Sequence, residues 1–218
     1  MRAALAAAAD PERAVRMREY MKSDMPFFGV PSTPLRRIVK EALGQHPLQA
    51  SDAWHDTVLA FWREATHREE RYVAIEIAAH RRFRTFRTRE ALPLFEELIV
   101  TGAWWDLVDS TAHVLRDLVR EDHAWMAERM REWASAPDPW KRRAAIISQL
   151  GLRSSTDLKL LRDCIEPNLA DRSFWIRKAI GWALREYAKT APEVVRAYVD
   201  ALGPRLSGLS RREALRHL

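Results

Sequence analysis

Cysteine is almost absent from this sequence: only Cys164 occurs in 218 residues. A single cysteine excludes an internal disulfide and fits a reducing compartment, and we interpret it as a core residue. The seven histidines form no pair at i, i+4 spacing, and neither an HExxH nor a CxxC motif occurs. The sequence therefore predicts no metal site and no cofactor.

Glycine and long apolar runs are also scarce. None of the seven glycines belongs to a loop that could cradle a phosphate. No stretch approaches the roughly eighteen uncharged apolar residues that a transmembrane helix requires. The opening MRAALAAAADP has one arginine and a short, weakly apolar run, so it makes a poor signal peptide. We therefore expect a soluble, cytoplasmic protein without a membrane partner.

Basic residues are abundant instead. The 36 Lys and Arg against 30 Asp and Glu give a net charge of +6 and a pI near 9.8. This balance favours an anionic partner such as nucleic acid, although a charged, solvated surface explains it as well. At 47% hydrophobic residues, the chain can bury a sizeable core as one domain or one repeat array.

Apolar residues recur at helical spacing, and the pattern repeats along the chain. Because such residues lie three and four apart, we predict an all-α fold. WDLVDST, WKRRAAI and WIRKAIG begin 35 residues apart, and the same step reaches three more helical segments. The six starting residues are Leu35, Glu70, Trp105, Trp140, Trp175 and Ser210.

Most of these segments follow another helical stretch, so the repeating unit is a helix pair. The preceding stretches are 53–65, 89–100, 122–134, 156–166 and 191–202. Helix pairs of this length stack into HEAT-like solenoids with a curved binding surface. We predict that residues 1–218 form a single domain of about six repeats, with an N-terminal helical segment and a concave basic groove.

Two residues break the repeat pattern. Four positions after each start the residue is small or apolar, except for Asp109. Seven positions after each start, Trp182 is larger than the residues of the other repeats, which are Ala42, Ile77, Ala112, Ile147 and His217. Positions 0, 3, 4 and 7 share one helical face. We therefore expect Trp105, Asp109, Arg143 and Trp182 to lie on comparable faces of three successive helices and to be able to converge on one groove.

For each of these residues, a purely structural role is the alternative to a functional one. An unpaired buried carboxylate costs several kcal/mol, so Asp109 either pairs, for instance with Arg143, or faces a wet groove. Trp105 shares its position with Trp140 and Trp175, and a repeated aromatic usually indicates core. We assign Asp106 to stabilisation of a helix N-terminus and Trp104 to packing.

Five stretches carry a family resemblance along nearly the whole chain. The sequence resembles the AlkD-type DNA alkylation-repair glycosylases, which are HEAT-like repeat proteins. The matching stretches are EYMKSDMPFFGVPSTPLRR, PLFEELIVTGAWWDLVDS, WKRRAAIISQL, IRKAIGWALREYAKTAPEVV and LSRREALRHL. One departure is Ser32, which is shorter than the residue that relatives often carry before the threonine.

The resemblance implies hydrolysis of the N-glycosidic bond of cationic alkylpurines, of the N3-methyladenine and N7-methylguanine type, in double-stranded DNA and without base flipping. It implies that Trp105 and Trp182 contact the lesion nucleotide and that Asp109 promotes bond cleavage. It assigns DNA contacts to a further set of residues. These are Arg143, Tyr20, Thr33, Arg185 and Lys189.

The chemistry suits these residue types. A purine alkylated at N3 or N7 is already a cationic leaving group, so a fixed carboxylate that stabilises positive charge on the sugar suffices. Tryptophan faces attract cations, and basic side chains bind phosphates. We expect a monomer with this activity. Two alternatives are a catalytically inactive repeat protein that binds damaged or branched DNA, and a scaffold for other proteins.

Overall fold

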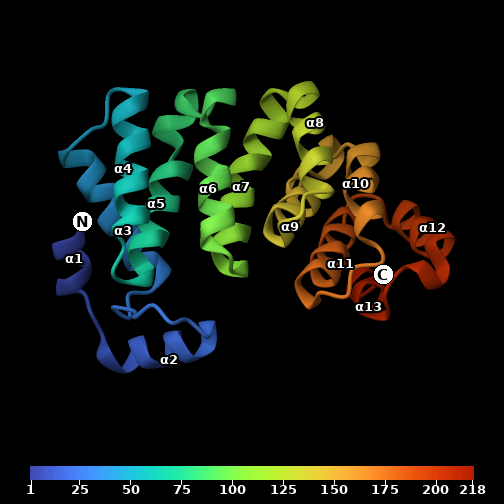
Figure 1. Cartoon of the computed structure of the whole chain (residues 1–218), viewed down its shortest axis with the longest axis horizontal. Coiled ribbons are helices and arrows are strands. Elements are labelled where there is room, and N and C mark those ends of the chain that lie inside the picture. The colour runs from blue at the N-terminus through green and yellow to red at the C-terminus, as the bar shows by residue number, and fades with distance from the viewer. The chain divides into compact units, whose positions relative to one another are not determined.

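The computed structural model describes all 218 residues, and every regular element in it is a helix (Figure 1). There are thirteen α-helices and five short 3-10 helices, η1 to η5, and no strand, which confirms the all-α prediction. The α-helices are α1 (Arg2–Ala7), α2 (Pro11–Met21), α3 (Ser32–Gln45), α4 (Ser51–Arg63), α5 (Arg68–Ala79), α6 (Leu92–Gly102), α7 (Trp105–Glu121), α8 (His123–Ala134), α9 (Pro139–Ile147), α10 (Leu158–Ile165), α11 (Phe174–Ala188), α12 (Pro192–Leu202) and α13 (Gly208–Ala214). No helix is long and apolar enough to cross a membrane.

The helices follow the 35-residue period. The six residues that start the repeat in the sequence fall in α3, α5, α7, α9, α11 and α13, and a further helix precedes each of the last five of these. Contacts divide the chain into two compact units, Met1–Leu94 and Phe95–Leu218. The organisation of all repeats as one domain with a concave groove stays a prediction.

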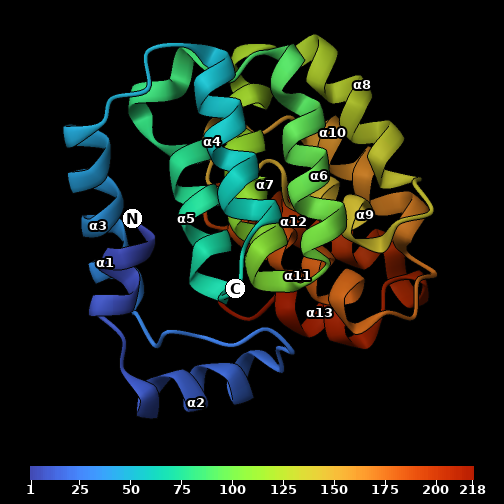
Figure 2. The same cartoon turned by 60° about the vertical axis from the view of Figure 1, so that its left-hand side comes forward.

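In the first unit, α5 packs against both α3 and α4, and α1 packs against α3. The large side chains Trp54, Trp62 and Ile77 are buried in its core. Helix α2 lies at the edge of this unit, and none of its residues is buried (Figure 2).

A buried carboxylate fixes the loop that leads into α3. Glu69, at the start of α5, accepts hydrogen bonds from the backbone N–H groups of Phe28, Gly29 and Val30 at 3.0, 2.8 and 3.0 Å. Gly29 has φ +85°, and a Cβ there would lie 2.2 Å from the carbonyl oxygen of Asp10. Only glycine fits this close, left-handed turn. The loop therefore presents the first turn of α3 in a fixed position.

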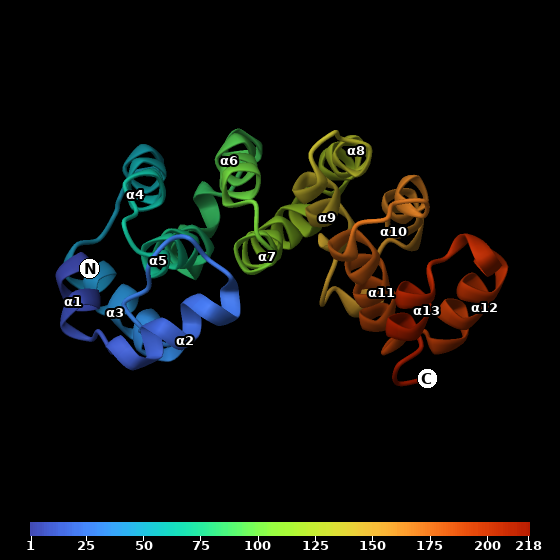
Figure 3. The ribbon, with the colours of Figure 1, turned by 60° about the horizontal axis from the view of Figure 1, so that its bottom comes forward.

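In the second unit, successive helices of the repeat stack on one another. Helix α9 contacts α7 and α11, and α11 contacts α13, while α8 packs on α7 and α9, and α12 packs on α11. Figure 3 shows these helices in two rows, with α8, α10 and α12 in one and α7, α9, α11 and α13 in the other. Nearest-neighbour packing of helix pairs is the hallmark of HEAT-like repeats.

One column of the repeat is closely packed throughout. The residues four positions after each repeat start are buried in all six repeats, and four of them are alanines with no exposed surface, namely Ala74, Ala144, Ala179 and Ala214. Small side chains let the stacked helices approach each other. Asp109 belongs to this column and is itself 9% exposed.

Candidate functional site

Asp109 forms a two-point ion pair with Arg143. Nε and Nη2 of Arg143 on α9 donate to Oδ1 and Oδ2 of Asp109 on α7, each at 2.7 Å. Nη1 of the same guanidinium donates to the backbone carbonyl of Trp175 on α11 at 2.6 Å. Arg143 therefore joins three successive helices of the stack and holds the carboxylate in one orientation.

The pair is almost enclosed by protein. The Asp109 side chain is 12% exposed and that of Arg143 is 4% exposed. Burial raises the pKa of Asp109 above its ordinary value, and the hydrogen bonds and positive charge of Arg143 oppose this rise. One turn further along α7, burial also lowers the pKa of His113. The site thus combines a desolvated carboxylate with one fixed counter-charge.

Three indole rings pack beside this pair. The Trp104 ring centroid lies 6.3 Å from that of Trp140 and 5.3 Å from that of Trp175, and the latter two lie 6.1 Å apart. Arg143 approaches the Trp175 ring at 6.0 Å. Trp104 is the N-cap residue of α7, so its ring braces the helix start that carries Asp109. This confirms the packing role expected for Trp104.

Two cations on α11 share one carboxylate on α13. Nζ of Lys178 lies 2.5 Å from Oε2 of Glu213, and Arg185 pairs with Oε1 of the same side chain, which is 7% exposed. A Cβ on Gly181 would lie 2.5 Å from Cβ of Glu213, so glycine permits this close helix approach. Trp182 lies between the two cations along α11 and is partly exposed.

The whole sequence matches the family model described as DNA alkylation repair enzyme, over residues 1–218. The chain belongs to this family. No functionally curated protein matches the sequence. A predicted DNA alkylation repair enzyme from Enterococcus faecalis is 30% identical, with a TM-score of 0.87 and 96% of each chain covered.

Two other solved structures show the same fold. They are AlkD2 from Streptococcus mutans, 13% identical, and smu.31 from Streptococcus mutans UA159, 14% identical. Each has a TM-score of 0.66 over 95% of this chain and 98% of the other. The match to AlkD2 confirms the helical-repeat fold. The family assignment confirms the resemblance seen in the sequence and makes this chain a member of a DNA repair enzyme family.

The structure brings some of the predicted residues of this repair-family chain together. Asp109 and Arg143 are in direct contact, which settles that the Asp109 carboxylate is paired. Trp105 is the first residue of α7 and is partly exposed, and Asp106 follows in the first turn, as expected. Lys189, at the C-terminal end of α11, is exposed and pairs with Glu186 at 2.6 Å.

Tyr20 and Thr33 belong to the first unit. Tyr20 is 75% exposed on α2, and Thr33 is exposed in the first turn of α3. Both are therefore accessible to a partner. Their assignment to DNA, like that of Arg185 and Lys189, stays a prediction.

Sequence reasoning missed the carboxylate that organises α11 and α13. Lys178 and Glu213 occupy the same repeat position, three residues after Trp175 and Ser210, and are therefore one 35-residue period apart. Opposite charges at equal positions of adjacent repeats were the signal that could have revealed the contact. Arg143 occupies the same position one repeat earlier, so this position supplies both partners of the Lys178–Glu213 pair and the arginine of the Asp109–Arg143 pair.

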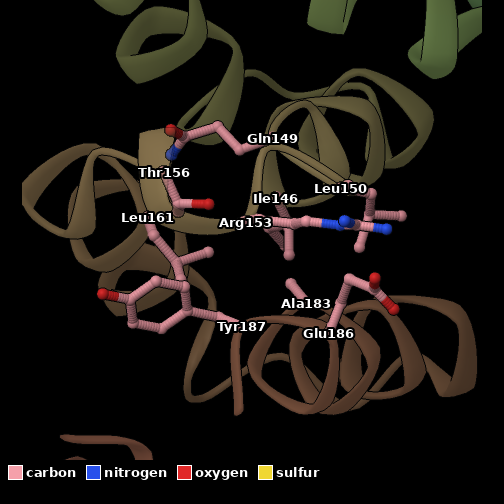
Figure 4. Close-up of a pocket in the computed structure, with 10 residues that line it drawn as sticks. Ile146, Gln149, Leu150, Arg153, Thr156, Leu161, Ala183, Glu186 and Tyr187 are labelled. Carbon is pink, nitrogen blue, oxygen red and sulfur yellow. The ribbon is translucent and has the colours of Figure 1, made fainter. Parts of the chain in front are cut away.

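A small cavity between α9, α10 and α11 offers no room for a substrate. Its lining includes Leu161, Ala183 and Tyr187, and its volume is about 10 Å³ (Figure 4). That volume is about what one water molecule needs. No group of three or more His, Cys, Asp or Glu side chains is placed to hold a metal ion.

Proposed function

We propose that this chain is a DNA glycosylase that hydrolyses the N-glycosidic bond of cationic alkylated purines, of the N3-methyladenine and N7-methylguanine type, in double-stranded DNA. Family membership supports DNA alkylation repair. The observation that supports the finer assignment is Asp109, a carboxylate oriented by Arg143 at a repeat position where four of the other five repeats place alanine.

The reaction requires the protein to hold the nucleotide in place and to set a negative charge near its sugar. The bond between C1′ and the purine nitrogen breaks, and its electron pair moves to the base, which leaves as a neutral purine. Positive charge then develops on the sugar, and a fixed carboxylate stabilises it. Water attacks C1′ and loses a proton, and in this proposal the Asp109 carboxylate accepts that proton. Base flipping is not required by this scheme.

The other predicted residues have supporting roles in this proposal. Trp105 and Trp182, both partly exposed, provide aromatic faces that attract a cationic nucleotide. Arg143 holds Asp109 ionised and oriented. Neutral lesions are expected to be poor substrates because their leaving groups lack the built-in positive charge.

The test measures, by chromatography, the release of free 7-methylguanine and 3-methyladenine from methylated duplex DNA. Asp109→Asn is expected to lower the single-turnover rate about 100-fold or more while duplex binding persists. Asp117→Asn is the matched control. It removes a carboxylate from the same helix, and that carboxylate also pairs with arginines, namely Arg116 and Arg120. Equal release by wild type and Asp109→Asn would contradict the mechanism.

A second function is favoured by the same ion pair. Because both oxygens of Asp109 accept hydrogen bonds from Arg143, the carboxylate has a complete structural role without any substrate. A catalytically inactive protein that binds damaged or branched DNA would then result. In the same assay it would bind methylated duplex DNA and release neither base.

A further inference from the structure

A cationic cleft in the first unit lies outside the site described above. It has a volume of about 450 Å³ and is lined by Lys40 and Leu43 of α3 and by His80, Arg81 and Arg82, which follow α5. Three of the five lining residues, Lys40, Arg81 and Arg82, are cations. The cleft therefore gathers positive charge at one place on this unit.

The cations of the cleft lack acidic partners. Lys40 and Arg81 are exposed and form no ion pair, and Nη1 of Arg82 donates to the carbonyl of Leu43 at 2.7 Å and to no carboxylate. The pKa of His80 is lowered, first by burial and then by the charges of Arg82 and Arg81, although Glu76 opposes this. Glu76 is itself paired with Arg36 at 2.8 Å. The cleft thus holds three cations that are not paired with a carboxylate.

The segment that carries these arginines is anchored rather than loose. The Phe83 side chain is fully buried, and the rings of Phe83 and Phe86 stack with their centroids 5.9 Å apart. Buried Arg87 donates to the carbonyl of Ala79 at 3.1 Å. With its aromatic residues held inward, the segment exposes Arg81, Arg82, Arg84 and Arg89 to solvent.

We propose that this cationic cleft, through Lys40, Arg81 and Arg82, binds the phosphodiester backbone of double-stranded DNA. It would be a DNA contact additional to those at the Asp109–Arg143 site, and it rests on the proposed function in taking DNA as the partner. Unpaired lysine and arginine side chains on an anchored surface are the groups that neutralise successive phosphates.

The lining favours a backbone over a small phosphorylated ligand. Pockets for small molecules are mostly apolar, with a few placed polar groups that orient the ligand. Here Leu43 is the one apolar lining residue, so the cleft holds charge without a surface that would recognise a base or another ring system. Contacts of this kind position DNA without reading its sequence.

The test measures binding of an undamaged duplex to the full chain by fluorescence anisotropy over a range of salt concentrations. The variant Lys40→Ala/Arg81→Ala removes the two exposed cations of the cleft. We expect affinity at least ~10-fold weaker at ~0.1 M salt, and a plot of log K against log salt shallower by about 2. Lys40→Arg/Arg81→Lys keeps both charges and is expected to restore binding.

The matched control is Lys159→Ala/Arg196→Ala, which removes the same charge from exposed cations that pair with Asp163 and Glu193. It is expected to bind DNA like wild type, as judged by affinity and salt slope. Equal losses in the control and the cleft variant would show an effect of net charge alone and overturn the proposal.

Base release separates this inference from the proposed function. At saturating methylated DNA the cleft variant is expected to release bases at the wild-type single-turnover rate, because Asp109 is unchanged. Wild-type DNA affinity in the cleft variant would overturn the cleft proposal and leave the glycosylase proposal standing. Competition by millimolar inorganic phosphate, matched for ionic strength with chloride, in wild type but not in the variant would identify a small-anion site and overturn the DNA assignment.

Discussion

The carboxylate of Asp109 and the guanidinium of Arg143 meet through two parallel hydrogen bonds of 2.7 Å between adjacent helices. In neighbouring repeats the position of Asp109 is occupied by fully buried alanine. Taking two charges out of water is costly, and replacing such a pair by apolar residues is often neutral or stabilising. A site of this kind therefore points to a role beyond stability.

This arrangement predicts opposite effects of single and double substitutions. Asp109→Ala leaves Arg143 buried without its counter-charge, so we expect a loss of about 3–5 kcal/mol in the free energy of unfolding. Asp109→Ala/Arg143→Met removes both charges and is expected to recover most of that loss. Urea denaturation measures both. A double variant as unstable as the single one would show that the pair itself stabilises the fold.

The rate of base release is expected to depend on the ionisation of Asp109. Since burial raises the pKa of this carboxyl and Arg143 opposes the rise, the carboxylate is lost as the pH falls through a value above the ordinary 3.8. The single-turnover rate should therefore fall on the acid side. Arg143→Gln removes the opposing charge, which raises the pKa of Asp109 further, so the acid limb should move up by about 1 pH unit or more.

The pH profile needs DNA without enzyme as a control at each pH, because acid itself releases purines. Far-UV circular dichroism at the same pH values checks that both proteins stay folded. An acid limb at the same pH in wild type and Arg143→Gln would mean that another group controls the rate.

The adjacent tryptophans Trp104 and Trp105 are expected to behave differently. Trp104 packs against Trp140 and Trp175, so Trp104→Ala should lower the free energy of unfolding by about 2–3 kcal/mol. Trp105→Ala should lower base release more than it lowers stability, if the ring contacts the lesion nucleotide. Thermal unfolding and base release on both variants separate the roles. A similar ratio of the two losses in both variants would contradict the division.

Periodicity accounts for most of what could be predicted about the fold. The five helices predicted ahead of the repeat starts lie within three residues of their observed bounds, and every repeat start falls in an α-helix. The burial of one helical face in each stacked unit imposes the 35-residue spacing. The same spacing singled out Asp109, since a carboxylate in a column of alanines needs a partner. Arg143, at position 3 of the next repeat, was a reasonable partner on the same grounds.

What the sequence could not reveal depends on side-chain direction and helix approach. The repeat pattern places Trp105 with Trp140 and Trp175, but it is Trp104, outside the pattern, whose ring contacts both. Trp104 precedes α7 as its N-cap in an extended conformation, whereas Trp140 and Trp175 lie in the first turns of their helices. The Glu213 contacts likewise depend on a close approach at Gly181, which spacing alone does not show.

That close approach gives the last prediction. In Gly181→Ala the new Cβ would lie 2.5 Å from Cβ of Glu213 and 2.9 Å from the carbonyl oxygen of Ser210, so α13 must move away from α11. We expect a loss of about 1–3 kcal/mol in the free energy of unfolding. Displacement of Glu213 should also release Lys178 and Arg185 from their shared partner and change the salt dependence of DNA binding.

Gly44→Ala is the matched control, because this glycine lies in α3 and a Cβ there meets nothing within 4 Å. Alanine favours a helix over glycine by up to about 1 kcal/mol, so this variant should be as stable as wild type or more stable. Urea denaturation of the two variants therefore gives shifts of opposite sign if α13 is seated on Gly181. A Gly181→Ala protein with wild-type stability would show that α13 can adjust at no cost, and that Glu213 does not depend on glycine for its position between the two cations.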